Sequence, residues 1–460
     1  MKLKIWLLAG TVAFGSANAL AAEKKDDYDC ANATNPPTGT LTLSDVIQIG
    51  LCRNPNTQSA YLTSEAARLN KNAAYAPYLP SVNASASAAK SYQNKNWGDL
   101  QKGASLSANW LIFDFGKRFS DLSQMAALWR ATGFDYDSTT QNYVYQLVAN
   151  YYSLLSADAT VQANTELVAV AAGARDVAAK KFSAGAVAKA DVLKADTTLA
   201  SQQLTLQQSQ GNREIAKGQL LSALSFPQAS ELNIADMPTT FGGAAENKAI
   251  GELIDKAKQQ RPDLLSAEES TTAAWHKRNS AFLSNLPRIS ATGQLSYNLN
   301  DTIYSDPSLG IYSATPDRLG ASVGVSVSMP IFAGFANAYN VRAQQVNYDN
   351  AKEREKAKND SVALDVWTAY QNYRTAVGVL KQTDVLLASA AESEKVTGGM
   401  YKVGRATMLD WQTQQSQLAD ARRQNIAAKY DLYVKRASLA LAVGDIQDEL
   451  NSGDSSNQSK

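Results

Sequence analysis

Four segments of this chain alternate apolar residues with glycine and small polar residues at a period of two. In Leu319–Ile331 every second residue is apolar, and most of the residues between are Gly or Ser. Gly103–Phe113, Ser81–Tyr92 and Arg288–Leu299 repeat the pattern, so each half of the chain holds two such segments. Alternation of this kind predicts a strand with one apolar and one polar face. About ten residues is also the length that a tilted strand needs to cross a bilayer core.

The N-terminus predicts export. Lys2 and Lys4 precede an apolar run, Ile5–Phe14, and a stretch of small residues follows. This is typical of a secretory signal peptide, assigned to residues 1–21, with cleavage possible after Ala19, Ala21 or Ala22. No later stretch approaches the roughly 18 apolar residues of a membrane-spanning helix. An exported chain that crosses a membrane by strands must form a closed barrel, which predicts the outer membrane.

The charge of the chain bears on its partners, and its cysteine content bears on a disulfide in the periplasm. The formal net charge is +1 and charged residues make up 19% of the chain, so nothing suggests a nucleic-acid partner. Cys30 and Cys52 are the only cysteines, and in an oxidising periplasm they predict one disulfide. A lipid anchor at Cys30 is the rival interpretation. The residues Asp-Tyr-Asp before Cys30 are unlike a lipid-attachment site and argue against it.

The chain contains an internal repeat. Asn54-Pro55 and Leu79-Pro80 match Arg261-Pro262 and Leu286-Pro287 at one offset, and Ile112-Phe113 matches Ile331-Phe332 at a larger one. The second half therefore carries extra residues between its strands, in Asn300–Arg318. We expect this loop to be longer than Gln93–Lys102 in the first half and to lie outside the cell.

In each half, a long helical stretch with little proline follows the pair of strands. We predict helical hairpins over 116–224 and 335–443, which turn at Gly185 and Gly404 because glycine permits the left-handed end of a helix. Shorter helices precede each first strand: Leu43–Leu51, Pro55–Tyr75, Lys248–Gln259 and Pro262–Leu283. The repeats then span 22–247, with a linker at 225–247, and 248–444. A polar tail, 445–460, is expected to be disordered.

Four strands cannot close a membrane barrel, because the smallest use eight. The chain must therefore oligomerise; two copies would supply eight strands and three would supply twelve. Small residues dominate the polar faces of the strands, so the interior is expected to be open to water. The predicted fold class is an α+β membrane protein with a long helical coiled coil.

With these features the chain resembles the TolC family of outer-membrane channel proteins. The marks are Arg261-Pro262-Asp263-Leu264, Ile112-Phe113-Asp114-Phe115-Gly116-Lys117, and the paired turns at Gly185 and Gly404. The resemblance implies a homotrimer, in which a twelve-stranded outer-membrane β-barrel continues as a helical periplasmic tunnel. It also implies an exit duct for drugs, small toxic compounds or a type I secreted polypeptide. The implied partners are a periplasmic adaptor, an inner-membrane RND or ABC transporter, and outer-membrane lipid.

The resemblance also implies a gate at the periplasmic tip, near the second turn. Tyr401 and Asp410 match the family's aromatic and first acidic positions, whereas Arg405 lies one residue from the expected arginine. Thr413 replaces the second acid, which implies a weaker cation block, and Asp191 stands at the corresponding acidic position of the first half. A ring of Asp410 carboxylates would attract cations. The alternative is that Asp410 and Asp191 only stabilise first helical turns.

Three other functions are alternatives to an exit duct: an enzyme, a passive porin and a structural protein. An enzyme is disfavoured, because His276 is the only histidine and neither a metal-ligand pattern nor a nucleophile motif is found; no cofactor is expected. A passive porin would need more strands and fewer long helices. A periplasm-spanning structural coiled coil would need larger apolar residues than the Ala, Gln and Ser of these helices.

Overall fold

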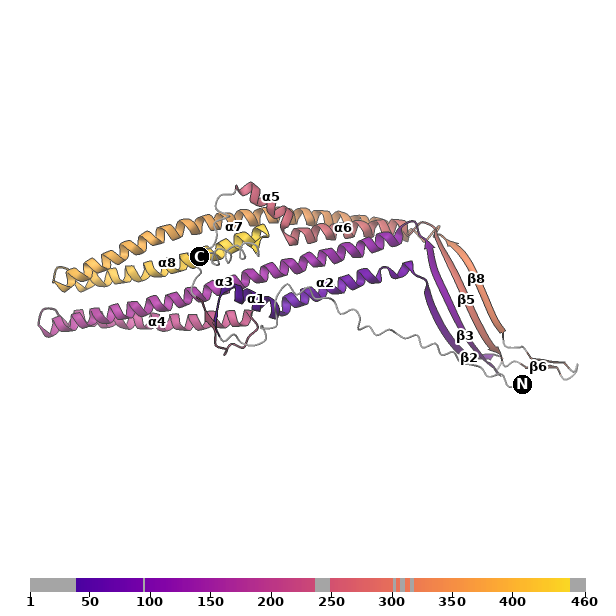
Figure 1. The fold of residues 1–460 in the computed structure, drawn as a ribbon, viewed down its shortest axis with the longest axis horizontal. Helices are drawn as coiled ribbons and strands as arrows, with labels where there is room; N and C mark the ends of the chain where they lie inside the picture. The colour runs from indigo at the N-terminus through magenta and orange to yellow at the C-terminus, as the bar shows by residue number, and fades with distance from the viewer. Residues whose placement is uncertain are drawn as a thin grey trace.

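The computed structural model describes residues 39–93, 96–235, 249–300, 303–306, 311–314 and 318–446. The predicted signal peptide, Cys30, residues 236–248 and most of the predicted tail lie outside these ranges. The proposed Cys30–Cys52 disulfide therefore stays a prediction. Figure 1 shows a long rod of helices with a small sheet at one end.

Both halves share one order of main elements; the first adds a 3₁₀ turn and the second adds a short hairpin. The first contains β1 (Thr40–Leu41), α1 (Leu43–Arg53), α2 (Pro55–Ala73), the 3₁₀ turn η2 (Ala76–Tyr78), β2 (Ser81–Gln93), β3 (Asn96–Phe113), α3 (Lys117–Ser183) and α4 (Lys189–Ala223). The second contains β4 (Asn233–Ile234), α5 (Ile250–Gln260), α6 (Pro262–Leu283), β5 (Arg288–Asn300), β6 (Ile303–Asp306), β7 (Ile311–Ala314), β8 (Arg318–Ser328), α7 (Ala336–Lys402) and α8 (Met408–Val443). The two long helices, α3 and α7, have 67 residues each.

The sheet arranges its strands in the order β2-β3-β5-β8, all antiparallel. Its register lines up apolar residues in rows, such as Ala84, Leu106, Leu295 and Ala321. The adjacent row is Ser85, Ser105, Ser296 and Gly320, with a hydrogen bond between the Ser85 and Ser105 hydroxyls at 2.8 Å. The sheet therefore has the two faces that the alternation predicts. In the single chain the apolar face is open, with Val323 92% exposed.

Three details of the strands differ from the sequence prediction. β3 begins at Asn96, so much of the expected loop Gln93–Lys102 is strand, because backbone pairing with β2 continues beyond the alternating segment. A bulge between Leu111 and Phe113 brings Phe113, instead of Ile112, opposite Ile289 on the apolar face. β8 ends at Ser328, before Pro330, which lacks the N–H that a strand needs.

Two segments expected to be irregular contain short strands. The β6–β7 hairpin lies in the longer connection of the second half, where a loop was predicted. In the predicted linker, β4 pairs in parallel with β1. Backbone groups that leave the main sheet or the helices thus still find partners through short local pairings.

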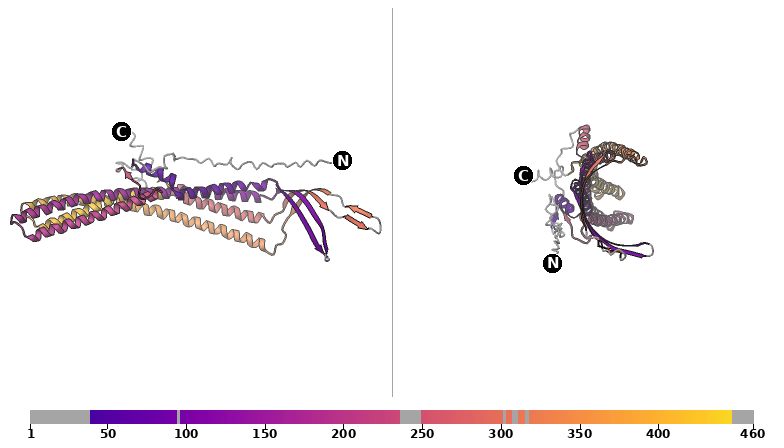
Figure 2. Two further views of the ribbon diagram at one scale, coloured as in Figure 1. Left: turned by 90° about the horizontal axis from the view of Figure 1, so that it is seen from below. Right: turned by 90° about the vertical axis from the view of Figure 1, so that its right-hand side faces the viewer.

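The helices continue the four-element width of the sheet. Next to the sheet, α3 packs against α2 and α6, and α6 packs against α7; farther away α3 packs against α4 and α8, and α8 against α7. The long helices α3 and α7 run through both levels. In the end-on view of Figure 2 the sheet and helices follow one open arc, with α1 on its convex side. None of the described helices is long and apolar enough to span a membrane.

The largest apolar core lies at mid-length, where α1 covers α3. Val46 of α1 and Leu147 and Tyr151 of α3 are fully buried there. The Tyr143 hydroxyl donates to the Ala223 carbonyl at 2.6 Å, which ties α3 to the end of α4. Gly50 packs closely on this core: a Cβ there would lie 2.5 Å from Leu147 Cδ1 and 2.9 Å from the Tyr143 hydroxyl, so these side chains would have to move. These contacts fix the place where the rod changes from one helix set to the other.

A charged cluster closes the start of α6 against α7 and α8. The Arg261 guanidinium donates to both carboxylate oxygens of Asp263, at 3.0 and 2.7 Å. It also donates to Asp365 Oδ2 at 3.0 Å. Lys358 also pairs with Asp263, at 2.7 Å. Burial would raise the pKa of Asp263, but the bonds from Arg261 and Lys358 outweigh it and lower the pKa to about 2.

We therefore expect Asp263 to stabilise the protein above about pH 4, and this contribution to disappear as the pH falls toward 2. A pKa depressed in the folded state favours folding only where the unfolded carboxyl is ionised, and here the effect is about 2 kcal/mol. Urea unfolding of the wild type and Asp263→Asn at pH 7 and pH 3 measures it. The difference should shrink at pH 3. Asp420→Asn, which removes an exposed ion pair with Arg423, should change stability little at either pH.

Candidate functional site

The two helical hairpins turn at glycines with left-handed backbones. Gly185 has φ 73° between α3 and α4, and Gly404 has φ 81° between α7 and α8. At both turns the next residue's N–H bonds back into the last helical turn, from Ala186 to the Lys181 carbonyl and from Arg405 to the Met400 carbonyl, each at 2.8 Å. Such bonds satisfy carbonyls that a helix end would leave unpaired. Both turns lie at the end of the rod opposite the sheet (Figure 1).

A small cluster of buried side chains, here called the tip cluster, joins the two hairpins. It consists of Ala174, Ala178, Ala195, Tyr401, Met408 and Trp411. The first three come from α3 and α4 and the others from α7 and α8, so α8 packs against the first-half hairpin through alanines. The rings of Tyr401 and Trp411 are 5.2 Å apart. Alanine gives a flat contact that relies on close approach more than on interdigitated large side chains.

Trp411 is held by α7. Its indole N–H donates to Glu394 Oε1 at 2.8 Å. A Cβ on Gly398 would lie 2.8 Å from Trp411 Nε1, so only glycine leaves room for the indole there. The hairpin of the second half is therefore rigid where it carries Tyr401 and Trp411 into the tip cluster.

Tyr401 is the predicted gate residue that the tip buries most completely, at 2% exposure. Lys181 at the end of α3 donates to the Tyr401 carbonyl, and its ammonium lies 4.4 Å from the centroid of the Tyr401 ring. Burial and the nearby Asp191 carboxylate raise the pKa of the Tyr401 hydroxyl. The fold thus brings Asp191 near enough to Tyr401 to affect its hydroxyl, across the boundary between the hairpins.

Asp410 and Arg405 lie apart from that contact and are exposed. Asp410 forms a capping box with Thr407: its Oδ2 accepts the Thr407 N–H at 2.9 Å and hydroxyl at 2.6 Å, while its own N–H donates to the Thr407 hydroxyl at 3.1 Å. The side-chain bond, followed by the backbone bond, lowers the pKa of Asp410. In one chain, therefore, Asp410 stabilises a first helical turn, and its place in a ring depends on other copies.

Sequence reasoning missed three residues that join the hairpins at the tip. Lys181 contacts Tyr401, Trp411 packs in the tip cluster, and Gln412 donates to the Lys194 carbonyl at 2.8 Å and to the Thr198 hydroxyl. Each partner is far away in sequence, and no local motif marks such a pair. For Trp411 alone the sequence holds a signal: Gly398 and Trp411 stand on either side of the turn at Gly404, and a small residue facing a large one indicates close packing of the two helices.

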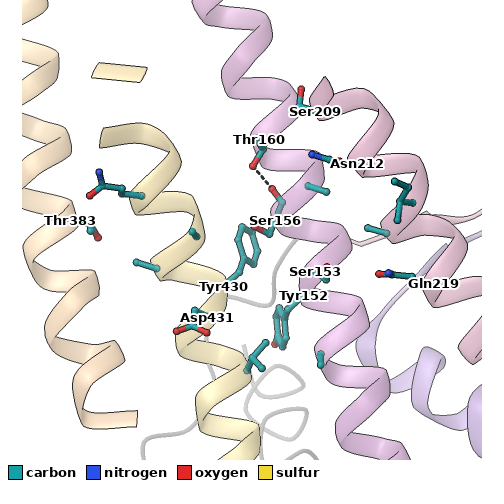
Figure 3. Close-up of a pocket in the computed structure, with 18 of the residues that line it drawn as sticks. Tyr152, Ser153, Ser156, Thr160, Ser209, Asn212, Gln219, Thr383, Tyr430 and Asp431 are labelled. Carbon is teal, nitrogen blue, oxygen red and sulfur yellow. Dashed lines mark hydrogen bonds between the residues drawn. The ribbon is translucent and has the colours of Figure 1, made fainter. Parts of the chain in front are cut away.

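A recess of about 870 Å³ lies at mid-length of the rod, between α3, α4, α7 and α8 (Figure 3). On α3 it is lined by Ser153, Ser156 and Thr160, about half a helical turn from the face under α1, and also by Tyr152, which belongs to the core under α1. Small hydroxyl, amide and alanine side chains dominate the rest. Asp431 is the sole charged residue among the described residues that line it. The lining therefore mixes small polar side chains with apolar and aromatic ones, among them Tyr152, Ile215 and Tyr430, and none of the described lining residues is cationic.

Comparison with known proteins agrees with these features. The sequence matches the family model of the outer membrane efflux proteins over residues 46–225 and 253–445. Protein CyaE of Bordetella pertussis is 22% identical over 423 residues, covering 90% of this chain and 86% of CyaE. Outer membrane protein TolC of Escherichia coli is 24% identical over 421 residues, covering 88% of this chain and 83% of TolC.

Solved structures show the same fold. The outer-membrane channel OprN matches with a TM-score of 0.76 at 21% identity, covering 88% of this chain and 90% of OprN. CusC matches with a TM-score of 0.77 at 18% identity, covering 87% of this chain and 92% of CusC. Relatives that are channel proteins are consistent with the expectation that the chain is not an enzyme. Because the family model spans both halves, this chain belongs to the outer membrane efflux protein family, the TolC family, and is located in the outer membrane, extending into the periplasm.

Proposed function

We propose that three copies of this chain form a continuous duct, with a twelve-stranded barrel in the outer membrane and a tunnel of helices below it. The observation that carries the proposal is the curved sheet β2-β3-β5-β8, whose outer strands β2 and β8 each pair on one side only among the described residues. Unpaired strand edges are costly in lipid, and joining β8 of one copy to β2 of the next removes them. The open apolar face would then meet the lipid.

The helical part supports the same assembly. Its helices lie side by side in the order of the strands above them, so three arcs would close into a tunnel of the same curvature. The recess at mid-length, with its mixture of small polar and apolar side chains, would line the lumen (Figure 3). Among the described lining residues only Asp431 is charged, so a solute would meet little charge that could hold it there.

We propose that the duct is the exit part of a tripartite export machine. It would receive drugs, small toxic compounds or a type I secreted polypeptide from an inner-membrane RND or ABC transporter, through a periplasmic adaptor. Exposed apolar side chains at the tip support contact with an adaptor: Val403 is 72% exposed, Leu409 59% and Leu193 55%. They surround the two turns, where a partner in the periplasm would arrive.

The tip would act as the gate of this duct. Tyr401 and Asp191 would belong to the contact that keeps the hairpins together, and Arg405 and Asp410, both exposed, would face neighbouring copies or the lumen. Closing the tip then depends on contacts between α8 and the first-half hairpin, which the tip cluster supplies.

Asp410→Ala is expected to weaken the block of single-channel current by divalent cations, because three carboxylates on a narrow ring attract cations. The same change removes the capping box, at a cost of about 1 kcal/mol. Thr407→Ala is the matched control, since it loses the cap but keeps the carboxylate, and its block should resemble the wild type. Equal block in Asp410→Ala and the wild type would exclude the ring.

The experiment for the whole proposal is the mass of the mature protein in detergent, followed by conductance in planar bilayers. A trimer with small, long-lived currents is the expected result. Large ungated currents would favour a passive porin-like barrel, and a monomer without current would favour a periplasm-spanning structural protein.

A further inference from the structure

Gln415 occupies a position on α8 that is otherwise apolar. The buried face of α8 near the tip consists of Met408, Trp411, Gln415, Leu418 and Ala421, at the three- and four-residue spacing of a helix seam. Trp411 packs in the tip cluster, and Leu418 and Ala421 pack against Ala390 of α7. Gln415, only 5% exposed, therefore lies in the seam between these two contacts.

The amide of Gln415 is not satisfied there. Among the residues that the structure describes, neither its oxygen nor its nitrogen has a hydrogen-bond partner. A buried amide without partners forfeits the hydrogen bonds that it makes with water whenever it is exposed. The packing of α8 in this structure is thus less stable than the same packing with an apolar residue at this position.

Two neighbouring glutamines on the same helix show the contrast. Gln412 donates to the Lys194 carbonyl at 2.8 Å, and Gln414 accepts a hydrogen bond from the Ser393 hydroxyl at 2.7 Å. They join α8 to α4 and to α7, respectively. The packing in this structure therefore acts differently on three glutamines within one turn. It gives Gln412 and Gln414 hydrogen bonds, whereas it leaves Gln415 without one among the described residues.

A second buried polar group lies one contact away. Within the described ranges the Tyr401 hydroxyl also has no hydrogen-bond partner, although the residue is 2% exposed and its ring packs on Trp411. Both groups belong to the second-half hairpin where it meets the first. A movement of α7 and α8 away from α3 and α4 would hydrate them together.

We propose that Gln415 is a positioning residue for channel opening, which keeps the closed tip metastable by placing an unsatisfied amide beneath Trp411. The inference rests on the proposed gate at the tip. Movement of α7 and α8 away from α3 and α4 that exposes Gln415 to water returns its hydrogen bonds, so part of the closed-state packing is offset before any partner binds. A polar residue at one position of an apolar seam has this effect in coiled coils, where it selects a packing at a cost in stability.

The test compares Gln415→Leu with Gln412→Leu in the full-length trimer, by single-channel recording and urea unfolding in detergent. We expect Gln415→Leu to lower the open population about tenfold, corresponding to about 1.4 kcal/mol, and to raise the urea midpoint. Gln412→Leu should raise the open population, because it removes a bond made only in the closed packing. Gln415→Met, which fits irregular space, should act like Gln415→Leu if the leucine variant assembles poorly.

A cross-link at the tip separates this inference from the proposed gate. Thr198→Cys with Gln412→Cys, joined by a short thiol cross-linker, should close the channel, since these side chains touch across the hairpins. If the cross-link leaves the conductance unchanged, the tip is not the gate and the proposed function fails. If the cross-link closes the channel but Gln415→Leu has the open population of the wild type or a higher one, the inference about Gln415 is overturned alone.

Discussion

Arg118→Leu should destabilise the protein by about 3–5 kcal/mol, the largest effect that we expect from one substitution. The Arg118 guanidinium donates to the carbonyls of Leu111, Ile112 and Pro77 at 2.7, 3.0 and 3.1 Å. It also pairs with Asp114 at 3.1 Å, and both side chains are almost fully buried. Leucine would leave three carbonyls and a buried carboxylate without this partner, where the sheet joins α3.

Arg130→Leu is the matched control. Arg130 also binds a carboxylate with two hydrogen bonds, to Glu269 at 2.8 Å each, but its side chain is 46% exposed. Its loss should cost less than about 1 kcal/mol. Urea unfolding in detergent, followed by tryptophan fluorescence, measures both variants. Equal loss of stability in the two would show that burial at the sheet-to-helix junction is not what gives Arg118 its effect.

Lys181→Met should raise the open population of the channel by about tenfold or more in bilayer recordings. The ammonium makes a charged hydrogen bond to the Tyr401 carbonyl and a cation–π contact with its ring, both between the two hairpins. A charged hydrogen bond contributes about 1.5–3 kcal/mol and the ring contact about 0.5–1 kcal/mol. Methionine keeps the length and apolar stem of the side chain but neither interaction.

Lys180→Met provides the comparison one residue away. Lys180 pairs with Asp176 on its own helix, with the two side chains 77% and 56% exposed, so it does not join the hairpins. Its removal should leave the currents unchanged. If both variants open the channel to the same degree, the effect comes from the loss of positive charge at the tip and not from the Tyr401 contact.

Much of the fold follows from local patterns in the sequence. Alternation in Leu319–Ser328 predicts the two faces of β8, and Pro55 and Pro262 stand at the first turns of α2 and α6, where proline needs no N–H partner. Gly185 and Gly404 stand where the backbone turns left-handed. Each of these signals acts through residues within a few positions of one another, so a single sequence suffices to identify it.

Other features are not local, and the sequence left them undetermined or misplaced. The alternating segment of β3 was too short a guide, because pairing with β2 continued over residues without that pattern. For Asp410 the gate and capping interpretations were both open, and the bond distances to Thr407 show the capping box. No pattern in the sequence indicates the role of Lys181, because Lys181 and Tyr401 are 220 residues apart in sequence.

By itself, then, the sequence determined the elements: strands with two faces, long helices, turns at glycine, and a repeat of the whole set. These depend on backbone sterics and on periodicity, which neighbouring residues fix. Only the tertiary structure decided which hairpins touch at the tip and which polar groups there find partners. Gln412, Gln414 and Gln415 have the same side chain. Only the packing of α8 against α3, α4 and α7 decides that the first two form hydrogen bonds, whereas Gln415 has no partner among the described residues.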